Sequence, residues 1–354
     1  MIDLPRQRYA FLALAAAVLF GASTPFAKLL LGELSPLALA GLLYLGSGLG
    51  LLTVRLAMRA RRRDQPAAEA PIMAGDYPWL AAAVITGGIA APILLLWGLA
   101  GTSASAASLL LNLESVVTML VAALLFGEAV CRRVVAAAAL MLAGATVLSW
   151  DPQAELKLSL HAIAILGACL CWALDNNFTR KISAGDPVAL AMIKGLAAGS
   201  LNLALAFALG FHLPGTAALA AALGVGFLGY GVSLVLFILA LRHLGAARTA
   251  AHFSTAPFIG AAIAILGLGE PITISFGIAL ALMLAATWLV LTERHEHAHA
   301  HEYLAHSHRH VHDAHHQHAH HGDEGPEPHT HWHEHPPMTH SHPHLPDLHH
   351  RHKH

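Results

Sequence analysis

Ten runs of about twenty predominantly apolar residues fill most of this 354-residue chain. A helix needs roughly 20 such residues to cross about 30 Å of hydrocarbon. Charged residues make up only 12% of the chain, whereas a soluble domain usually carries about 25%. The sequence therefore predicts an all-α integral membrane protein with ten transmembrane helices, and it argues against a soluble enzyme or a nucleic-acid-binding domain. The predicted spans are Ala10–Leu31, Ser35–Val54, Trp79–Ala100, Ser103–Phe126, Val134–Trp150, Leu158–Thr179, Val188–Phe211, Thr216–Leu241, Thr249–Gly267 and Ile272–Leu291.

Lys and Arg are unevenly divided between the two sets of loops that ten spans create. With the N-terminus in the cytoplasm, the inside segments hold 14 of these cations, and the outside loops hold only Lys157. Cytoplasmic loops of membrane proteins carry the excess of positive charge. We therefore expect both termini to be cytoplasmic and the chain to lie in the cytoplasmic (inner) membrane, with the lipid bilayer as its main partner.

A five-helix unit occurs twice in the sequence. Because five is an odd number of crossings, the second unit enters the membrane from the opposite side, which predicts an inverted repeat. Many secondary transporters have this architecture, with a binding site near the midplane between the halves. The matched blocks are Phe20–Lys28 with Trp172–Arg180, Ser35–Leu39 with Asp186–Leu190, and Asn112–Glu128 with Ser254–Glu270.

Three motifs carry a family resemblance: the Phe20–Lys28 stretch, the paired Gly127-Glu128 and Gly269-Glu270, and the run Thr102–Leu110. Through them the chain resembles the EamA-type permeases of the drug/metabolite transporter superfamily over about residues 10–292. The resemblance implies ten helices and the export of small organic solutes without ATP hydrolysis. One departure is that the family usually has Leu-Glu-Pro in its fourth helix. Here that motif reads Leu113-Glu114-Ser115, and the corresponding proline is present only in the second copy, as Pro257.

The chain divides into four predicted segments. These are a cytoplasmic N-terminus (residues 1–9), a first EamA-like repeat (residues 10–150), a second EamA-like repeat (residues 151–292) and a histidine-rich cytoplasmic tail (residues 293–354).

Ionisable residues inside the spans need a reason, because each costs about 2.5–3.5 kcal/mol at a helix centre on insertion scales. Glu114 lies in the middle of its predicted span. It is predicted to be either a proton or substrate-cation site facing the central cavity, or a protonated structural carboxyl. Asp175 and Lys194 are predicted to meet as an ion pair, either structural or gating, with Asn176 beside them.

Other residues are weaker candidates for the transport pathway. Lys28 lies near the outer end of the first span, where its amine could reach the surface. His252 could ligate a metal with Glu114, or it could be a structural histidine. Trp97 and Trp172, with Tyr44, Tyr230 and Phe237, could line an aromatic cavity or lie at the interface.

Histidine is concentrated at the end of the chain, where 24 of the 28 histidines lie within residues 295–354. The spacing is mostly His-x-His, and alternate residues of an extended chain share one side. Neutral imidazole suits Ni, Co, Zn and Cu ions, so the tail is predicted to bind these metals and to be disordered when empty. Alternatively, the tail could act as a pH-responsive polycation. The predicted ligands are His295, His297, His299, His301, His306, His308, His310, His312, His315, His316, His318, His320, His321, His329, His331, His333 and His335.

Nothing in the sequence matches a catalytic motif such as Gly-x-Ser-x-Gly or His-Glu-x-x-His, and no cofactor is required. We therefore expect a secondary transporter of a small organic metabolite or drug-like solute, most simply an exporter. Two alternatives stay open: a divalent transition-metal exporter, and a membrane metal sensor that transports nothing. The sequence also leaves open whether the chain forms a homodimer.

Overall fold

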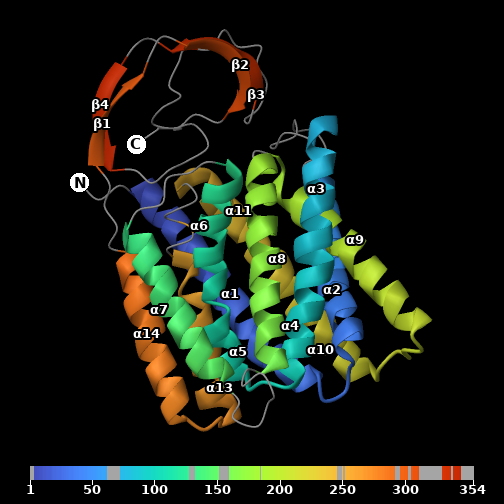
Figure 1. Cartoon of the computed structure of the whole chain (residues 1–354). Helices are drawn as coiled ribbons and strands as arrows, with labels where there is room; N and C mark the ends of the chain where they lie inside the picture. Colours follow the sequence, from blue (N-terminus) through green and yellow to red (C-terminus); the bar gives the residue numbers. More distant parts are fainter. Residues whose placement is uncertain are drawn as a thin grey trace.

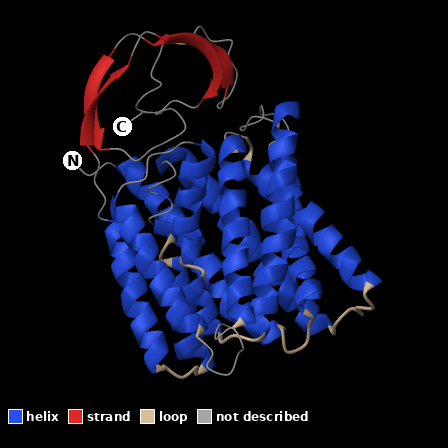
Figure 2. Ribbon diagram, in the orientation of Figure 1, coloured by secondary structure: helices blue, strands red, loops and turns tan. Residues whose placement is uncertain are grey.

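The computed structural model describes residues 4–61, 72–126, 132–150, 159–183, 185–244, 249, 252–291, 296–301, 304–310, 329–335 and 338–343. Over the described part up to residue 291 the chain is a bundle of helices (Figures 1 and 2). The elements are α1 (Leu4–Leu30), α2 (Pro36–Arg61), the 3₁₀ helix η1 (Ala74–Asp76), α3 (Tyr77–Ala83), the π-helix η2 (Val84–Ala90), α4 (Ala91–Ala100), α5 (Ala104–Leu110), α6 (Leu113–Phe126), α7 (Arg132–Ser149), α8 (Leu160–Ile182), α9 (Pro187–Ala208), α10 (Thr216–Gly226), the π-helix η3 (Phe227–Val232), α11 (Ser233–Leu244), α13 (Ala256–Leu268), α14 (Ile274–Leu291), and the strands β1 (Glu296–His301), β2 (Leu304–His310), β3 (His329–His335) and β4 (Met338–Pro343).

Seven helical segments of the described chain are long and apolar enough to cross a membrane. Shorter apolar helices, Val135–Ser149, Ala256–Leu268 and Ile274–Leu289, lie in the other three predicted spans. Each of the ten predicted runs therefore contains helix, while the count of ten crossings stays a prediction. Helix α1 begins and α14 ends on the same side of the bundle, as an even number of crossings requires (Figure 1).

The two halves pack against each other through equivalent helices. Helix α2 packs against its counterpart α9, and α7 packs against its counterpart α14. Helix α1 contacts α11 and α13, and its counterpart α8 contacts the corresponding helices of the first half, α4 and α6. The repeat read from sequence blocks thus has a matching set of helix contacts.

Glycines allow the backbones of α2 and α9 to approach closely. A Cβ added at Gly48 would lie 2.5 Å from the backbone nitrogen of Leu196, and one added at Gly199 would lie 2.4 Å from that of Leu45. The two contacts are equivalent, since Gly48 corresponds to Gly199 and Leu45 to Leu196 in the repeat. Small residues permit such approach in membrane proteins, where helices associate largely through close packing.

Irregular segments also fall at matching places in the two halves. The π-helix η2 interrupts the third predicted span, and η3 interrupts the eighth. A turn at Leu111 and Asn112 separates α5 from α6 in the fourth span, and a turn at Ser254 and Thr255 precedes α13 in the ninth. Interruptions of this kind inside a membrane body are tolerated where neighbouring groups satisfy the freed backbone atoms.

The fourth span breaks although it lacks the proline that the family usually has after Glu114. Ser115 Oγ donates a hydrogen bond of 2.9 Å to the Asn112 carbonyl, and Cys169 Sγ on α8 donates one of 3.6 Å to the Leu110 carbonyl. A hydroxyl that bonds back to an earlier carbonyl competes with the helical ladder. These side chains accommodate the turn without proline.

The tail differs from the prediction that it is disordered, because four of its segments are strands. Strand β1 pairs with β4, and β2 pairs with β3, both antiparallel. The His-x-His alternation has the period of two that a strand requires. A lack of large apolar residues excludes a packed core, but it does not exclude strands that pair through their backbones.

The close packing of α2 and α9 generates a stability prediction. Gly199→Ala should lower the stability of the purified protein by about 1–3 kcal/mol, because the new Cβ overlaps the α2 backbone. Gly224→Ala is the matched control, since a Cβ at Gly224 on α10 meets nothing within 4 Å. Thermal unfolding in detergent should show a lower midpoint for Gly199→Ala alone. Equal midpoints would contradict the packing described here.

Candidate functional site

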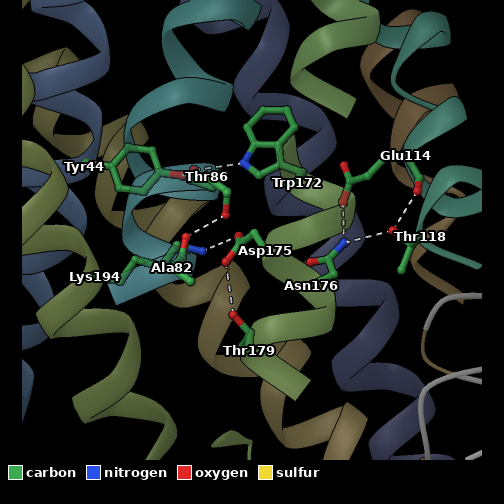
Figure 3. A network of polar contacts seen from close by, with 11 residues as sticks. Tyr44, Ala82, Thr86, Glu114, Thr118, Trp172, Asp175, Asn176, Thr179 and Lys194 are labelled. Carbon is green, nitrogen blue, oxygen red and sulfur yellow. Dashed lines mark hydrogen bonds and ion pairs between the residues drawn. The ribbon is translucent and has the colours of Figure 1, made fainter. Parts of the chain in front are cut away.

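Polar side chains of the membrane body gather around the π-helix η2 (Figure 3). They come from helices that are distant in sequence, so only the folded bundle assembles them. Five predicted pathway residues take part: Glu114, Trp172, Asp175, Asn176 and Lys194. Tyr44 from α2, Thr118 from α6 and Thr179 from α8 belong to the same group, and Figure 3 also shows Thr86 of η2, whose hydroxyl donates to the Ala82 carbonyl.

Glu114 lies two residues beyond the break between α5 and α6, and it is only partly buried. Its Oε1 accepts a hydrogen bond of 2.8 Å from Asn176 Nδ2 on α8. The same Asn176 amide lies 3.4 Å from Thr118 Oγ1, and Thr118 donates to the backbone carbonyl of Glu114 at 2.7 Å. The carboxylate is therefore held by a neutral amide, that of Asn176, which Thr118 in turn contacts.

Asp175 and Lys194 form the ion pair that their sequence positions predict. Their side chains are bonded to each other, and both are about 6% exposed. Thr179 Oγ1 donates a further hydrogen bond of 3.1 Å to Asp175 Oδ1. A Cβ at Gly87 would lie 2.0 Å from Asp175 Oδ2, so η2 can close over this carboxylate only because position 87 is glycine.

Two carbonyls of η2, those of Gly87 and Gly88, accept hydrogen bonds from side chains of three other helices. Tyr44 and Trp172 both donate to the Gly87 carbonyl, Trp172 through Nε1 at 3.1 Å. Asn202 Nδ2 on α9 donates to the Gly88 carbonyl at 3.0 Å. A polar backbone group left unpaired in an apolar interior is costly. These three donors therefore stabilise the irregular segment that covers the ion pair.

The two sets of charges differ in accessibility, which decides what each can do. The Asp175–Lys194 pair is buried and carries no net charge, so its direct effect is structural. Glu114 is more exposed and has only a neutral amide as its described side-chain partner. A carboxylate in that state can take up a proton or contact a cation.

Aromatic rings lie next to the polar group. Phe20 on α1 lies 5.8 Å from Trp172 and 5.9 Å from Tyr230 between ring centroids, in edge-to-face geometry. Tyr44 and Tyr230 are 5.3 Å apart, and Phe253 is 5.4 Å from Phe20. Three of the aromatics predicted to line a cavity, Tyr44, Trp172 and Tyr230, thus belong to one cluster. Phe237 joins it through Phe253, at 4.9 Å.

Three predicted pathway residues lie apart from this group. Lys28 Nζ donates to the carbonyls of Leu99 and Thr102, at 2.6 and 2.8 Å, and so caps the end of α4. Trp97 is 44% exposed and stacks on His161 at 4.8 Å. His252 accepts hydrogen bonds from Thr255 through its backbone carbonyl, and no described contact joins it to Glu114.

Sequence reasoning missed several polar residues that the structure uses. Thr118, Thr179 and Asn202 are uncharged residues in apolar runs. The sequence gives a signal only for Thr118 and Thr179, through their four-residue spacing from Glu114 and Asp175. Glu270 enters the sequence analysis only as part of the Gly269-Glu270 motif. In the structure its carboxylate accepts hydrogen bonds from the backbone nitrogens of Ala104 and Ser105, at 2.7 and 2.8 Å, and caps α5 of the other half.

Metal ligands were predicted in the tail, and their side chains lie outside what the structure describes. Among the side chains that are described, no group of three or more His, Cys, Asp or Glu could hold a metal ion. Ten of the predicted tail ligands occupy strand positions. The others lie outside the described residues: His295, His312, His315, His316, His318, His320 and His321.

The buried ion pair generates a prediction about folding. Lys194→Met should lower stability by about 3–5 kcal/mol, because it leaves the Asp175 carboxylate buried without its cation. The double variant Asp175→Asn with Lys194→Met should recover much of that loss, since no uncompensated charge remains. Yield and thermal unfolding in detergent measure both. A double variant no more stable than Lys194→Met would show that the pair does not act as a unit.

Comparisons with known proteins agree with this architecture. Residues 7–150 and residues 159–292 each match the EamA-like transporter family. A protein of Methanothermobacter thermautotrophicus named "Uncharacterized transporter" is 28% identical over 282 residues, which cover 75% of this chain and 81% of that protein. One solved structure, described only as "Crystal structure of protein", has the same fold, with a TM-score of 0.59 at 16% identity over 80% of this chain and 96% of its own. The chain is a multi-pass membrane protein and belongs to the EamA-like transporter family.

Proposed function

We propose that this protein is a secondary transporter that exports a small organic solute across the cytoplasmic membrane, with Glu114 as its proton or substrate-cation site. The proposal depends on a contrast between two sets of charged residues. Glu114 is partly exposed and has no described cation as a partner, whereas Asp175 and Lys194 are buried and paired with each other. An ionisable residue inside a membrane body is costly unless it has a use.

The proposal includes ten crossings arranged as two inverted five-helix repeats. The support is threefold: the family matches the two halves separately, equivalent helices pair with each other, and π-helices interrupt corresponding spans. In transporters built this way, substrate and coupling ions bind near the midplane at discontinuous helices. Glu114 follows the break between α5 and α6, which is where such a site is expected.

Both termini are proposed to be cytoplasmic, on the basis of the Lys and Arg asymmetry between loops. The outward direction of transport is taken from the resemblance to EamA-type permeases. Asp175 and Lys194 are proposed to position η2 against α8, and the aromatic cluster around Phe20 is proposed to supply apolar surface for the solute. No catalysed reaction and no cofactor form part of the proposal.

Glu114→Gln should abolish transport while leaving the amount of protein in the membrane unchanged. The substitution keeps the size of the side chain and removes its charge and its titratable proton. Glu33→Gln is the matched control, because Glu33 is exposed in the turn between α1 and α2. The measurement is untargeted profiling of metabolites released by cells that express wild type, either variant, or no transporter.

The same cultures, grown under mild Ni, Co, Zn and Cu load, distinguish the alternatives by elemental mass spectrometry. A metabolite released by wild type and Glu33→Gln, but not by Glu114→Gln, supports the proposal. A fall in one cellular metal with no released metabolite would replace it with metal export. No difference in either measurement would favour a sensor that transports nothing.

Stopping the chain after Arg294 should leave the membrane body folded and active. The body from α1 to α14 contains the whole described core, and the tail adds no described residue to it. Membrane abundance and the release of the same metabolite test this expectation. If the shortened chain disappeared from the membrane, the division into a body and an appended tail would be wrong.

A further inference from the structure

The strand pairing of the tail places histidine opposite histidine. In the β1–β4 pair, His297 is opposite His342 and His299 is opposite His340. In the β2–β3 pair, the opposed positions are His306 with His333, His308 with His331, and His310 with His329. These five pairs join segments that are about 20 to 45 residues apart in the chain.

The register decides whether the histidines share a face. Positions directly opposite each other lie on the same face of an antiparallel pair, and a slip of one residue would move one strand's set to the other face. In both strand pairs the histidines of one strand lie directly opposite histidines of the other, so both sets lie on one face. We call each pair of directly opposed positions a row. The rows between the histidine rows hold none of these histidines, for example Ala298 opposite Ser341 and Ser307 opposite Trp332.

Two neighbouring rows of such a pair have dimensions that suit one metal ion. Opposed positions in a pair have Cβ atoms about 4.5–5.5 Å apart, and the next row on the same face is about 6.8 Å further along. Four positions thus outline a rectangle of a size that four imidazoles can close around one ion. Structural zinc sites are almost always four-coordinate, with Zn–N distances of about 2.0–2.1 Å.

We propose that each strand pair of the tail forms one four-histidine site for a divalent transition metal, so that the chain holds two tightly bound ions. In β1–β4 the site consists of positions 297, 299, 340 and 342. In β2–β3 there are three rows, and a four-histidine site needs two adjacent rows that include the central row of His308 and His331. The proposal does not depend on what the membrane body transports.

This proposal differs from binding by an unstructured histidine-rich chain. If the tail were unstructured, any histidine could substitute for any other, and binding would be graded with no fixed number of ions. In the paired tail, a histidine contributes according to its row and face. Exchanging two adjacent residues, which changes neither composition nor charge count, should then change the number of bound ions.

The test uses the full chain purified in detergent, with Zn²⁺ as the probe. After equilibrium dialysis at a low free Zn²⁺ concentration, elemental analysis counts the ions bound per chain. The chain stopped after Arg294 is measured alongside to subtract any zinc held by the body. We expect two ions per chain for the wild-type tail.

The decisive variant exchanges Ser307 and His308, written Ser307→His with His308→Ser. It leaves His306 and His310 on the original face two rows apart, so no slip of register restores two adjacent histidine rows. We expect one bound ion in place of two. The control exchanges Gln317 and His318, written Gln317→His with His318→Gln, and should keep both ions.

Hydrogen exchange gives a second readout. Zn²⁺ should slow amide exchange in residues 304–310 and 329–335 of wild type, but not of the Ser307/His308 exchange variant. Equal zinc binding by the two exchange variants, or many weak ions on the wild-type tail, would overturn the proposal. So would zinc binding that leaves amide exchange in both segments unchanged.

Discussion

The need to satisfy every backbone polar group inside an apolar body shapes this protein more than any single contact does. Where a helix is interrupted, a side chain from another helix forms a hydrogen bond with the backbone group that has lost its helical partner. Tyr44, Trp172 and Asn202 donate in this way to two carbonyls of η2. Lys28 does the same for the last carbonyls of α4, and Glu270 accepts from the first amides of α5. In hydrocarbon no water can supply these bonds, so the irregular segments exist only with their partners.

That constraint distinguishes the charged residues of the membrane body by the partners that their side chains have. Lys28 and Glu270 bond to backbone groups, while Asp175 and Lys194 neutralise each other beneath Gly87. Glu114 is bound through its side chain by the amide of Asn176 alone among the described contacts. Glu114 lies in the first turn of α6, where the helix dipole favours a carboxylate, but no described cation neutralises it, and this makes it the best candidate for transport chemistry.

The sequence predicts the positions and the packing of the helices better than it predicts the residues of the candidate site. Apolar runs of about twenty residues locate the helices, and the blocks around Phe20, Ser35 and Asn112 predict the repeat and thereby the packing of α2 on α9. The meeting of Asp175 with Lys194 also follows from helices that are consecutive in the chain. The positions of Lys28 and Trp97 do not follow, because whether an end-of-helix cation or an aromatic faces lipid, a cap or a cavity depends on helix rotation. Asn202 gave no signal, since one polar residue in an apolar run is common, and Thr118 gave only its four-residue spacing from Glu114.

The two halves share their arrangement of helices but not their charged residues. Gly87 in η2 packs on Asp175, and the equivalent Gly229 in η3 packs on Ser23, which is the counterpart of Asp175 in the first repeat. The counterpart of Glu114 is Ala256, so neither the carboxylate nor the ion pair is duplicated. In each half, therefore, a π-helix lies close to a neighbouring helix: η2 to α8, and η3 to α1. Only the contact between η2 and α8 involves a charged residue, Asp175. Because the other approach is made by a small neutral residue, the contacts that hold η2 and η3 in place differ in kind. If Glu114 binds a proton or a substrate cation, as we propose, that binding takes place next to the charged contact only, so it acts on the two halves unequally.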